Sequence, residues 1–292
     1  MDDTLLSVGL DVGTTTTQLI ISKLQVRNAA SGFAVPEMEI RERQVIYRSP
    51  VHFTPLIREQ RVDGAGIRKI VEQEYAQAGI TRKQVDTGAV IITGETSRKE
   101  NAAAVLESLS EFAGDFVVAT AGPHLESVLA AKGAGAVAWS EETGKRVLHF
   151  DIGGGTSNWA LMEAGKILET GCLNVGGRLI KLDDTGRVQY VSSVLEKLCK
   201  LKPGDNASKE QIAAVSQRLV EALEMVAGLR EQTELLEQLW TQEAGAVCVP
   251  RHDDAVISFS GGVADCILRK RDWLAFGDIG PILGKTDRKS VV

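Results

Sequence analysis

Hydrophobic and polar residues near the N-terminus form short runs that predict strands rather than helices. Residues 5–10 are mostly apolar, a Gly- and Thr-rich stretch follows at 11–17, and β-type residues resume at 18–21. This order predicts a strand, a tight turn and a second strand. Residues 25–63 mix Pro, Gly and charges, so we expect an insertion there around a third strand at 44–47.

Helical spacing begins further along the chain. Apolar side chains recur three or four residues apart at 64–77, and β-branched residues follow at 89–93. After another helical stretch, 116–119 reads as a strand, and 123–135 reads as a helix closed by two glycines. Strands that alternate with helices predict an α/β sheet.

The strand, turn and strand pattern then returns. Residues 147–150 predict a strand that leads into a Gly-rich turn, and strands at 159–162 and 166–168 follow the turn. The apolar spacing of 209–237 predicts one long amphipathic helix.

The last strand that the pattern predicts is at 255–259. It turns into a helix that we expect to begin near Cys266. After Pro281 the chain becomes polar, and we expect no further element.

Composition indicates a globular chain of two lobes. Its 292 residues are many for one hydrophobic core, and 43% are apolar. We expect a first lobe at 1–138, with the insertion near 25–63, and a second lobe at 139–292. The net charge of −6 argues against a nucleic-acid partner, because binding a phosphate backbone needs a basic stripe.

The cysteines and the N-terminus indicate the compartment. No Cys-x-x-Cys pair occurs among Cys172, Cys199, Cys248 and Cys266, so we expect reduced, mostly buried thiols. The start of the chain is acidic, and no apolar run approaches the roughly 20 residues that span a membrane. We therefore expect a cytoplasmic protein without a membrane partner.

The strongest chemical signal is a repeated turn. Asp-Val-Gly-Thr-Thr-Thr-Thr at 11–17 is echoed by Asp-Ile-Gly-Gly-Gly-Thr-Ser-Asn at 151–158. Such turns expose backbone N–H groups and hydroxyls that can approach a phosphate. The candidate phosphate-binding residues are Gly13, Thr14, Thr15 and Thr16 in the first turn and Gly153, Gly154, Gly155 and Thr156 in the second.

Each turn begins with an acid. Asp11 and Asp151 would repel phosphates unless a divalent cation lay between, so both are candidate Mg²⁺ anchors. A single Asp-x-Gly would more often just close a hairpin. Two copies in matching context favour a shared function. For His149 we expect a structural role in its strand.

This arrangement resembles the actin, heat-shock-protein-70 and sugar-kinase superfamily. Residues 123–135 resemble its connecting helix, and 259–264 resemble its adenosine loop, with Gly261 and Gly262. The resemblance implies two actin-like (ribonuclease H-like) lobes, each a mixed sheet flanked by helices, with ATP or ADP and Mg²⁺ in a cleft between them. It also implies supporting phosphate contacts at Gly176 and Gly177.

Three acids are candidate catalytic residues under this resemblance. They are Asp11 and Asp151, which we also expect to anchor the metal, and Glu126 on the connecting helix. Glu126 could orient the attacking water, although an ordinary exposed helical glutamate is an open alternative.

Over nearly its whole length the chain is similar to the ethanolamine ammonia-lyase reactivating factor family. The similarity lies in the two turns, in 47–55, in 92–101 and in 259–265. It implies a chaperone-like ATPase that acts on ethanolamine ammonia-lyase and exchanges damaged adenosylcobalamin for intact cofactor. Cobalamin would be handled through that partner, in association with the ethanolamine-utilization microcompartment.

The resemblance has a limit at the C-terminus. Family members continue past 277–281 with another Gly-rich strand, turn and helix, so we expect the second lobe to be incomplete and its ATPase activity impaired. A small-molecule kinase and a nucleotide-dependent interaction protein that does not hydrolyse ATP remain open. An activator of a radical dehydratase is disfavoured, because the dispersed cysteines do not suggest an iron–sulfur cluster.

Overall fold

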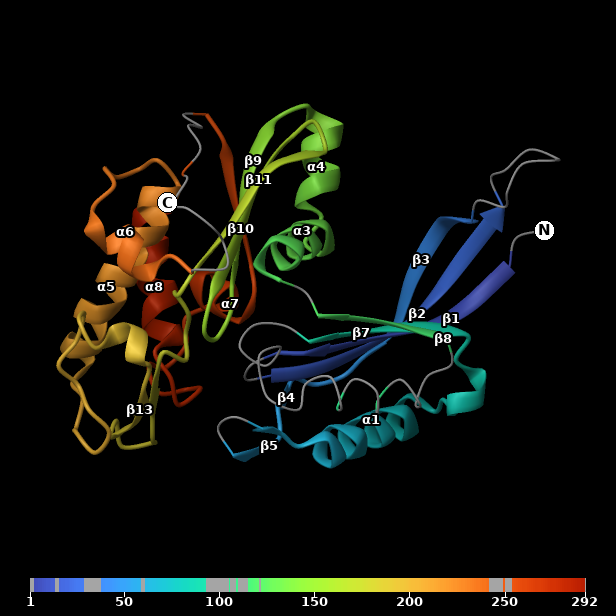
Figure 1. The fold of residues 1–292 in the computed structure, drawn as a ribbon, viewed down its shortest axis with the longest axis horizontal. Helices are drawn as coiled ribbons and strands as arrows, with labels where there is room; N and C mark the ends of the chain where they lie inside the picture. Colours follow the sequence, from blue (N-terminus) through green and yellow to red (C-terminus); the bar gives the residue numbers. More distant parts are fainter. Residues whose placement is uncertain are drawn as a thin grey trace. The chain divides into compact units, whose positions relative to one another are not determined.

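A computed structural model of the chain describes residues 3–13, 16–28, 38–58, 61–92, 105, 109, 115–120, 122–241, 249 and 254–291 (Figure 1). Its contacts divide the chain into two units, Met1–Ala121 and Gly122–Val292. Residues 122–138 thus group with the second unit, whereas the sequence analysis assigned them to the first lobe. The reason is that their helices pack on strands of the second sheet.

The first unit is built on a mixed sheet with the strand order β3-β2-β1-β7-β8, and β4 pairs with β2 beside it (Figure 1). Strands β1, β2 and β3 are antiparallel, and β1, β7 and β8 are parallel. The strands of this sheet are β1 (Asp3–Val12), β2 (Thr16–Asn28), β3 (Met38–Arg48), β4 (His52–Phe53), β7 (Thr87–Ile92) and β8 (Asp115–Thr120).

One face of this sheet is covered by α1 (Gly64–Ala78). Asp63 caps its N-terminus by accepting the N–H of Gly66 at 3.0 Å, and Gly79 ends it in the left-handed region at φ 67°. Ile67, Val71 and Tyr75 of α1 pack against the buried residues of β1 and β2. A short ribbon of β5 (Leu56–Arg58) and β6 (Arg61–Val62) precedes α1, and the 3₁₀ turn Arg82–Gln84 follows it.

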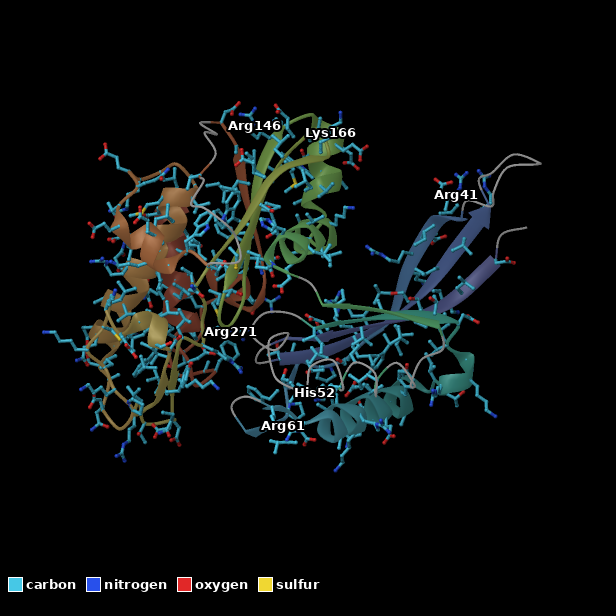
Figure 2. All side chains as sticks on the ribbon, viewed as in Figure 1. Arg41, His52, Arg61, Arg146, Lys166 and Arg271 are labelled. Carbon is cyan, nitrogen blue, oxygen red and sulfur yellow. The ribbon has the colours of Figure 1, made fainter. Side chains whose placement is uncertain are left out.

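The third strand is longer than the sequence predicted. β3 covers Met38–Arg48 rather than only 44–47, and it pairs with β2 along its length. Much of the expected insertion is therefore part of the sheet. Residues 39–46 are exposed, as Arg41 illustrates (Figure 2). Because neither face of this part of the strand is buried, its sequence lacks the alternation of apolar and polar residues that predicts a strand.

The second unit repeats this arrangement with the strand order β11-β10-β9-β14. Strands β9, β10 and β11 are antiparallel, and β14 is parallel to β9. The strands are β9 (Arg146–Ile152), β10 (Ser157–Glu163), β11 (Lys166–Leu173) and β14 (Val256–Ser260), with a separate hairpin of β12 (Ile180–Leu182) and β13 (Val188–Val191). In both units, then, a hairpin that carries an Asp-x-Gly turn lies next to a parallel strand.

Helices cover both faces of the second sheet. One face packs on α3 (Pro123–Gly133) and α4 (Ala136–Thr143). The other face joins the larger core, whose helices are α5 (Lys209–Val226), α6 (Glu234–Leu239), α7 (Gly262–Leu268) and α8 (Gly280–Val291). The strand β10 lies between these layers, and six of its seven residues are buried because both of its faces are covered.

Three sequence predictions about helices are wrong. The single helix predicted at 209–237 is two, because the chain turns at Gly228, with φ 69°, and restarts at Thr233, which caps α6. The helix predicted near Cys266 already begins at Gly262. The region after Pro281, expected to lack an element, is α8, whose Ile282 and Leu283 are buried in the core.

Two further expectations concern the thiols and membrane helices. Cys172 and Cys266 are buried and Cys199 is partly buried, as expected, while Cys248 lies outside the described residues. Within the described part of the chain, no helix has the length and apolar character that crossing a membrane requires.

Candidate functional site

The first turn closes a regular hairpin. Asp11 pairs with Gln18 across β1 and β2, and the N–H of Gly13 donates to the carbonyl of Thr16 at 2.8 Å. The sequence placed Gly13 and Thr16 at a phosphate turn, and both lie at its ends. Thr14 and Thr15, predicted to bind phosphate, lie outside the described residues.

The second turn has the same geometry. Asp151 pairs with Asn158 across β9 and β10, and the N–H of Gly153 donates to the carbonyl of Thr156 at 2.9 Å. In each unit an acid therefore lies opposite a side-chain amide, and a glycine N–H closes the turn onto a threonine carbonyl.

The second turn presents unused donors. No described residue accepts a hydrogen bond from the backbone N–H of Gly154, Gly155 or Thr156. A Cβ at Gly155 would meet no atom within 4 Å, so the space beside this backbone is open. Adjacent N–H groups on an open turn are a suitable environment for an anion such as phosphate.

Gly176 and Gly177 lie directly behind this turn. The N–H of Gly177 donates to the carbonyl of Gly153 at 3.0 Å, and the N–H of Arg178 donates to that of Gly154 at 2.6 Å. A Cβ on Gly176 would lie 2.3 Å from the carbonyl oxygen of Gly154. These glycines therefore support the turn through backbone contacts that require the absence of a side chain.

Gly261 and Gly262 follow β14 and begin α7. Gly261 has φ 90°, and a Cβ there would lie 2.4 Å from the carbonyl oxygen of Ile152, one residue before the turn. A Cβ on Gly262 would meet open space. Of the two glycines predicted from the sequence, Gly261 is therefore tightly packed against the start of the turn, and Gly262 borders open space.

Asp151 is fixed by residues from β14. The hydroxyl of Ser260 donates to Oδ1 of Asp151 at 2.5 Å, and it lies 3.0 Å from Nε2 of His149. Nδ1 of His149 is 2.7 Å from the hydroxyl of Ser258. Burial lowers the pKa of His149, although the negative charge of Asp151 acts in the other direction and raises it. His149 is thus a neutral, hydrogen-bonded strand residue, which confirms the structural role expected from the sequence.

Glu126 reaches the hairpin from α3. The amide Nδ2 of Asn158 donates to Oε2 of Glu126 at 3.0 Å. Asn158 is only 6% exposed, and its Oδ1 has no hydrogen-bond partner in the described chain. Sequence reasoning missed Asn158 as a site residue, although its position opposite Asp151 was a usable signal.

In the described part of the chain the site contains no preformed metal cage. The described residues hold no group of three or more His, Cys, Asp or Glu side chains arranged to bind a metal. Asp11 belongs to the first unit and Asp151 to the second. A Mg²⁺ ion at either carboxylate would therefore need water and phosphate oxygens as its other ligands, which is its usual behaviour.

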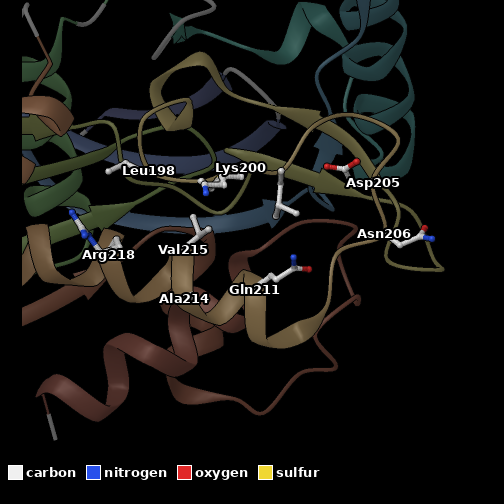
Figure 3. A pocket seen from close by; sticks show the side chains of 10 residues that line it. Leu198, Lys200, Asp205, Asn206, Gln211, Ala214, Val215 and Arg218 are labelled. Atoms are coloured by element: carbon white, nitrogen blue, oxygen red, sulfur yellow. The ribbon is translucent and has the colours of Figure 1, made fainter.

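A separate cavity of about 600 Å³ opens between α5 and the loop that precedes it (Figure 3). Its lining includes the apolar side chains of Leu198, Leu201 and Val215 and the cations Lys200 and Arg218. None of the residues predicted for the phosphate site lines it. The cavity and the glycine-rich turn are thus different features of the second unit.

Comparisons with known proteins extend this picture. The fold is similar to that in a crystal structure of the Aquifex aeolicus member of the Ppx/GppA protein family, with a TM-score of 0.50 and 15% sequence identity. The structural alignment covers 91% of this chain and 69% of the Aquifex aeolicus chain. Two mixed sheets flanked by helices, each with the same hairpin, define an actin-like fold.

Similarity in sequence shows the family to which the chain belongs. The model of "Ethanolamine utilisation protein EutA" matches residues 3–291, and the chain belongs to this family. The chain is 42% identical over 287 residues to "Ethanolamine ammonia-lyase reactivase EutA" of Escherichia coli (strain K12). It is also 42% identical over 293 residues to the protein of the same description from Salmonella typhimurium. These matches cover 96% of the chain and 60% of each relative, so the chain spans less than two thirds of their length.

Proposed function

We propose that this chain binds ATP or ADP with Mg²⁺ through its two glycine-rich turns and acts in the reactivation of ethanolamine ammonia-lyase. The reactivation would exchange damaged adenosylcobalamin, held by the lyase, for intact cofactor. The observation that carries the proposal is the 42% identity with two reactivases over 96% of the chain. In this proposal the site of action is the cytoplasm, in association with the ethanolamine-utilization microcompartment.

The second turn supports the nucleotide part of the proposal. The N–H groups of Gly154, Gly155 and Thr156 lack acceptors in the described chain, and the space beside Gly155 is open. They would hold phosphate oxygens, and the first turn would supply Gly13 together with Thr14, Thr15 and Thr16. Gly176 and Gly177 would keep the turn in place, and Gly261 and Gly262 would let the nucleoside approach the backbone.

Asp11 and Asp151 would hold Mg²⁺, directly or through water. The ion supplies positive charge that lets carboxylates and phosphates share one site. Ser260 fixes one oxygen of Asp151, and the second oxygen would take this role. Glu126, held by Asn158, would orient a water molecule for hydrolysis.

The first test is thermal unfolding of the chain with and without Mg²⁺-ATP and Mg²⁺-ADP. A ligand at 100 times its dissociation constant adds about 2.7 kcal/mol to the free energy of unfolding. A Mg²⁺-dependent rise in Tm supports the site, and the absence of any rise contradicts the nucleotide part of the proposal.

Substitution of the two acids tests the metal anchors. We expect Asp11→Asn and Asp151→Asn each to weaken Mg²⁺-ATP affinity about tenfold or more, since a charged contact contributes about 1.5–3 kcal/mol. Asparagine keeps the shape and can still accept the Ser260 hydroxyl at position 151. Titration calorimetry measures the loss. The matched control is Asp184→Asn, an exposed acid in the β12–β13 turn, and unchanged affinity in both variants would refute the two assignments.

Lyase reactivation tests the wider function. Purified ethanolamine ammonia-lyase inactivated with damaged cofactor should regain activity on addition of this chain, ATP, Mg²⁺ and adenosylcobalamin. Recovery with ATP but without release of phosphate would favour a nucleotide-dependent interaction protein that does not hydrolyse ATP. Nucleotide binding without any recovery, combined with phosphorylation of a small hydroxyl compound, would favour a kinase.

A further inference from the structure

The segment at 47–55 is joined to the first turn by a set of buried polar contacts. It is part of the sequence pattern that resembled the reactivating factors, and none of its residues entered the proposed nucleotide site. It connects β3, β4 and α1 with Gly13. The inference below rests on the proposed function, because it concerns the same turn.

Glu74 is the centre of these contacts. It lies on α1 and is completely buried, at 0% exposure. The hydroxyl of Tyr47 donates to its Oε2 at 2.5 Å, and Nε2 of His52 lies 2.7 Å from its Oε1. Each carboxylate oxygen thus has a partner, as burial of a charge requires. We call Tyr47, His52 and Glu74 the Glu74 cluster.

The Glu74 cluster fixes where β4 lies. Tyr47 lies one residue before the end of β3 and pairs with Ile21, while His52 begins β4 and pairs with Thr17, so both lie along β2. His52 lies between the sheet and α1 (Figure 2). Because the buried carboxylate needs both donors, it holds the end of one strand and the start of the next against the same helix.

The start of α1 holds the other end of the segment. The N–H of Asp63 donates to the carbonyl of Pro55 at 2.9 Å. A Cβ on Gly66 would lie 2.7 Å from Cβ of Pro55, so the proline packs directly on the first turn of the helix. The chain between His52 and Pro55 is therefore attached to α1 on both sides.

Thr54 lies within this attached stretch and reaches the turn. It is 7% exposed, and its hydroxyl donates to the carbonyl of Gly13 at 2.8 Å. Its Oγ1 also lies 3.1 Å from that of Thr17, and Thr17 must be the donor because the Thr54 proton is already used. Thr54 thus binds the residue that opens the first turn.

The second unit contains a counterpart of this contact. There the carbonyl of Gly153, the counterpart of Gly13, accepts the N–H of Gly177 at 3.0 Å. In both hairpins the glycine N–H closes the turn, and its carbonyl is held by a donor from outside the hairpin. The donor is the Thr54 hydroxyl in the first unit and the backbone N–H of Gly177 in the second, and the two donors come from unrelated segments.

We propose that Thr54 is a positioning residue for nucleotide binding, and that the Glu74 cluster sets its location. The hydroxyl fixes the carbonyl of Gly13 at the start of the first turn. Loss of this hydrogen bond lets the peptide rotate and lowers the affinity for nucleotide phosphates without unfolding the unit.

The test compares Thr54→Val with Thr54→Ser in the full chain. Valine matches threonine in shape and lacks the hydroxyl, whereas serine restores it. We expect Thr54→Val to weaken Mg²⁺-ATP affinity about fivefold, the effect of one hydrogen bond, and Thr54→Ser to stay within about twofold of wild type. Tyr47→Phe, which removes one donor to Glu74, should lower the affinity in the same direction. Titration calorimetry well below the unfolding temperature measures all three.

A matched control separates positioning from general stability. Val71→Ala removes two buried methyl groups from the same helix and lowers Tm, but it should leave nucleotide affinity unchanged. Wild-type affinity in Thr54→Val, or a loss of affinity in Val71→Ala as large as in Thr54→Val, overturns the inference and leaves the proposed function intact. Failure of the wild-type chain to bind Mg²⁺-ATP overturns both.

Discussion

Gly176→Ala is expected to destabilise the second unit by about 3 kcal/mol and to abolish nucleotide binding. The added Cβ would lie 2.3 Å from the carbonyl oxygen of Gly154 and 2.7 Å from the N of Gly155. Both atoms are backbone, so neither can move aside like the end of a flexible side chain. Relief requires displacement of the whole turn, and such overpacking typically costs about 1–3 kcal/mol or more. Urea unfolding and calorimetric titration with Mg²⁺-ATP measure the two effects.

Gly155→Ala is the matched control in the same turn. A Cβ at Gly155 meets nothing within 4 Å, and the residue is not in the left-handed region. Stability should change by no more than about 0.5 kcal/mol. Affinity for Mg²⁺-ATP should still fall, because the methyl group occupies the approach of the phosphates. Wild-type stability in Gly176→Ala would show that the two loops do not pack as described.

Asp287→Asn is expected to stabilise the chain by about 4 kcal/mol more at pH 8 than at pH 4. Asp287 lies on α8, is 2% exposed, and has an Oδ2 without a hydrogen-bond partner in the described chain. Burial, reinforced by the charge of Glu224 on α5, raises the pKa of Asp287 to about 7. The carboxyl therefore stays protonated in the folded protein when it would already be ionised in the unfolded chain.

The sign of the effect follows from proton binding. Below about pH 4 both states hold the proton, and the group does not affect stability. As pH rises from about 4 to 7, the unfolded chain loses its proton first, so the free energy of unfolding falls. Above pH 7 the full cost remains, and asparagine removes it. Denaturant unfolding at several pH values measures the difference. Asp272→Asn, at an exposed acid, controls for the loss of one charge, and a pH-independent difference for Asp287→Asn would contradict the assignment.

The two hairpins could be predicted because their signals are local. An acid, a hydrophobic residue and a glycine between two β-type runs indicate a turn whatever the rest of the chain does. The same pattern predicted that Asp11 and Asp151 lie at equivalent positions in the two hairpins, and their pairing with Gln18 and Asn158 agrees with this. Gly261 and Gly262 were predicted from the resemblance of 259–264 to the adenosine loop, and Gly261 is packed closely against the backbone of Ile152.

The elements that the sequence reading missed depend on contacts between distant residues. In α8 the buried side chains include Asp287, so the apolar periodicity fails after Leu283. Glu74 looks like one more charge on an amphipathic helix, and only the fold brings Tyr47 and His52 to it. The break between α5 and α6 could have been predicted from the sequence, because Gly228 is a helix stop signal and Thr233 is a helix start signal. The prediction gave more weight to the continuous apolar spacing across 209–237 and so missed the break.

The pairing of Ser260 with Asp151 has a consequence for the order in which the chain folds. The turn at 153–156 closes between adjacent strands, whereas Ser260 and Asp151 are 109 residues apart in sequence. Closure of so long a loop has a larger entropic cost than closure of a hairpin, so β14 docks after β9 and β10 have paired. During synthesis the turn at 153–156 leaves the ribosome long before the strand that fixes Asp151. Under the proposed function, nucleotide would therefore stabilise the second unit only late in folding, once that strand is in place.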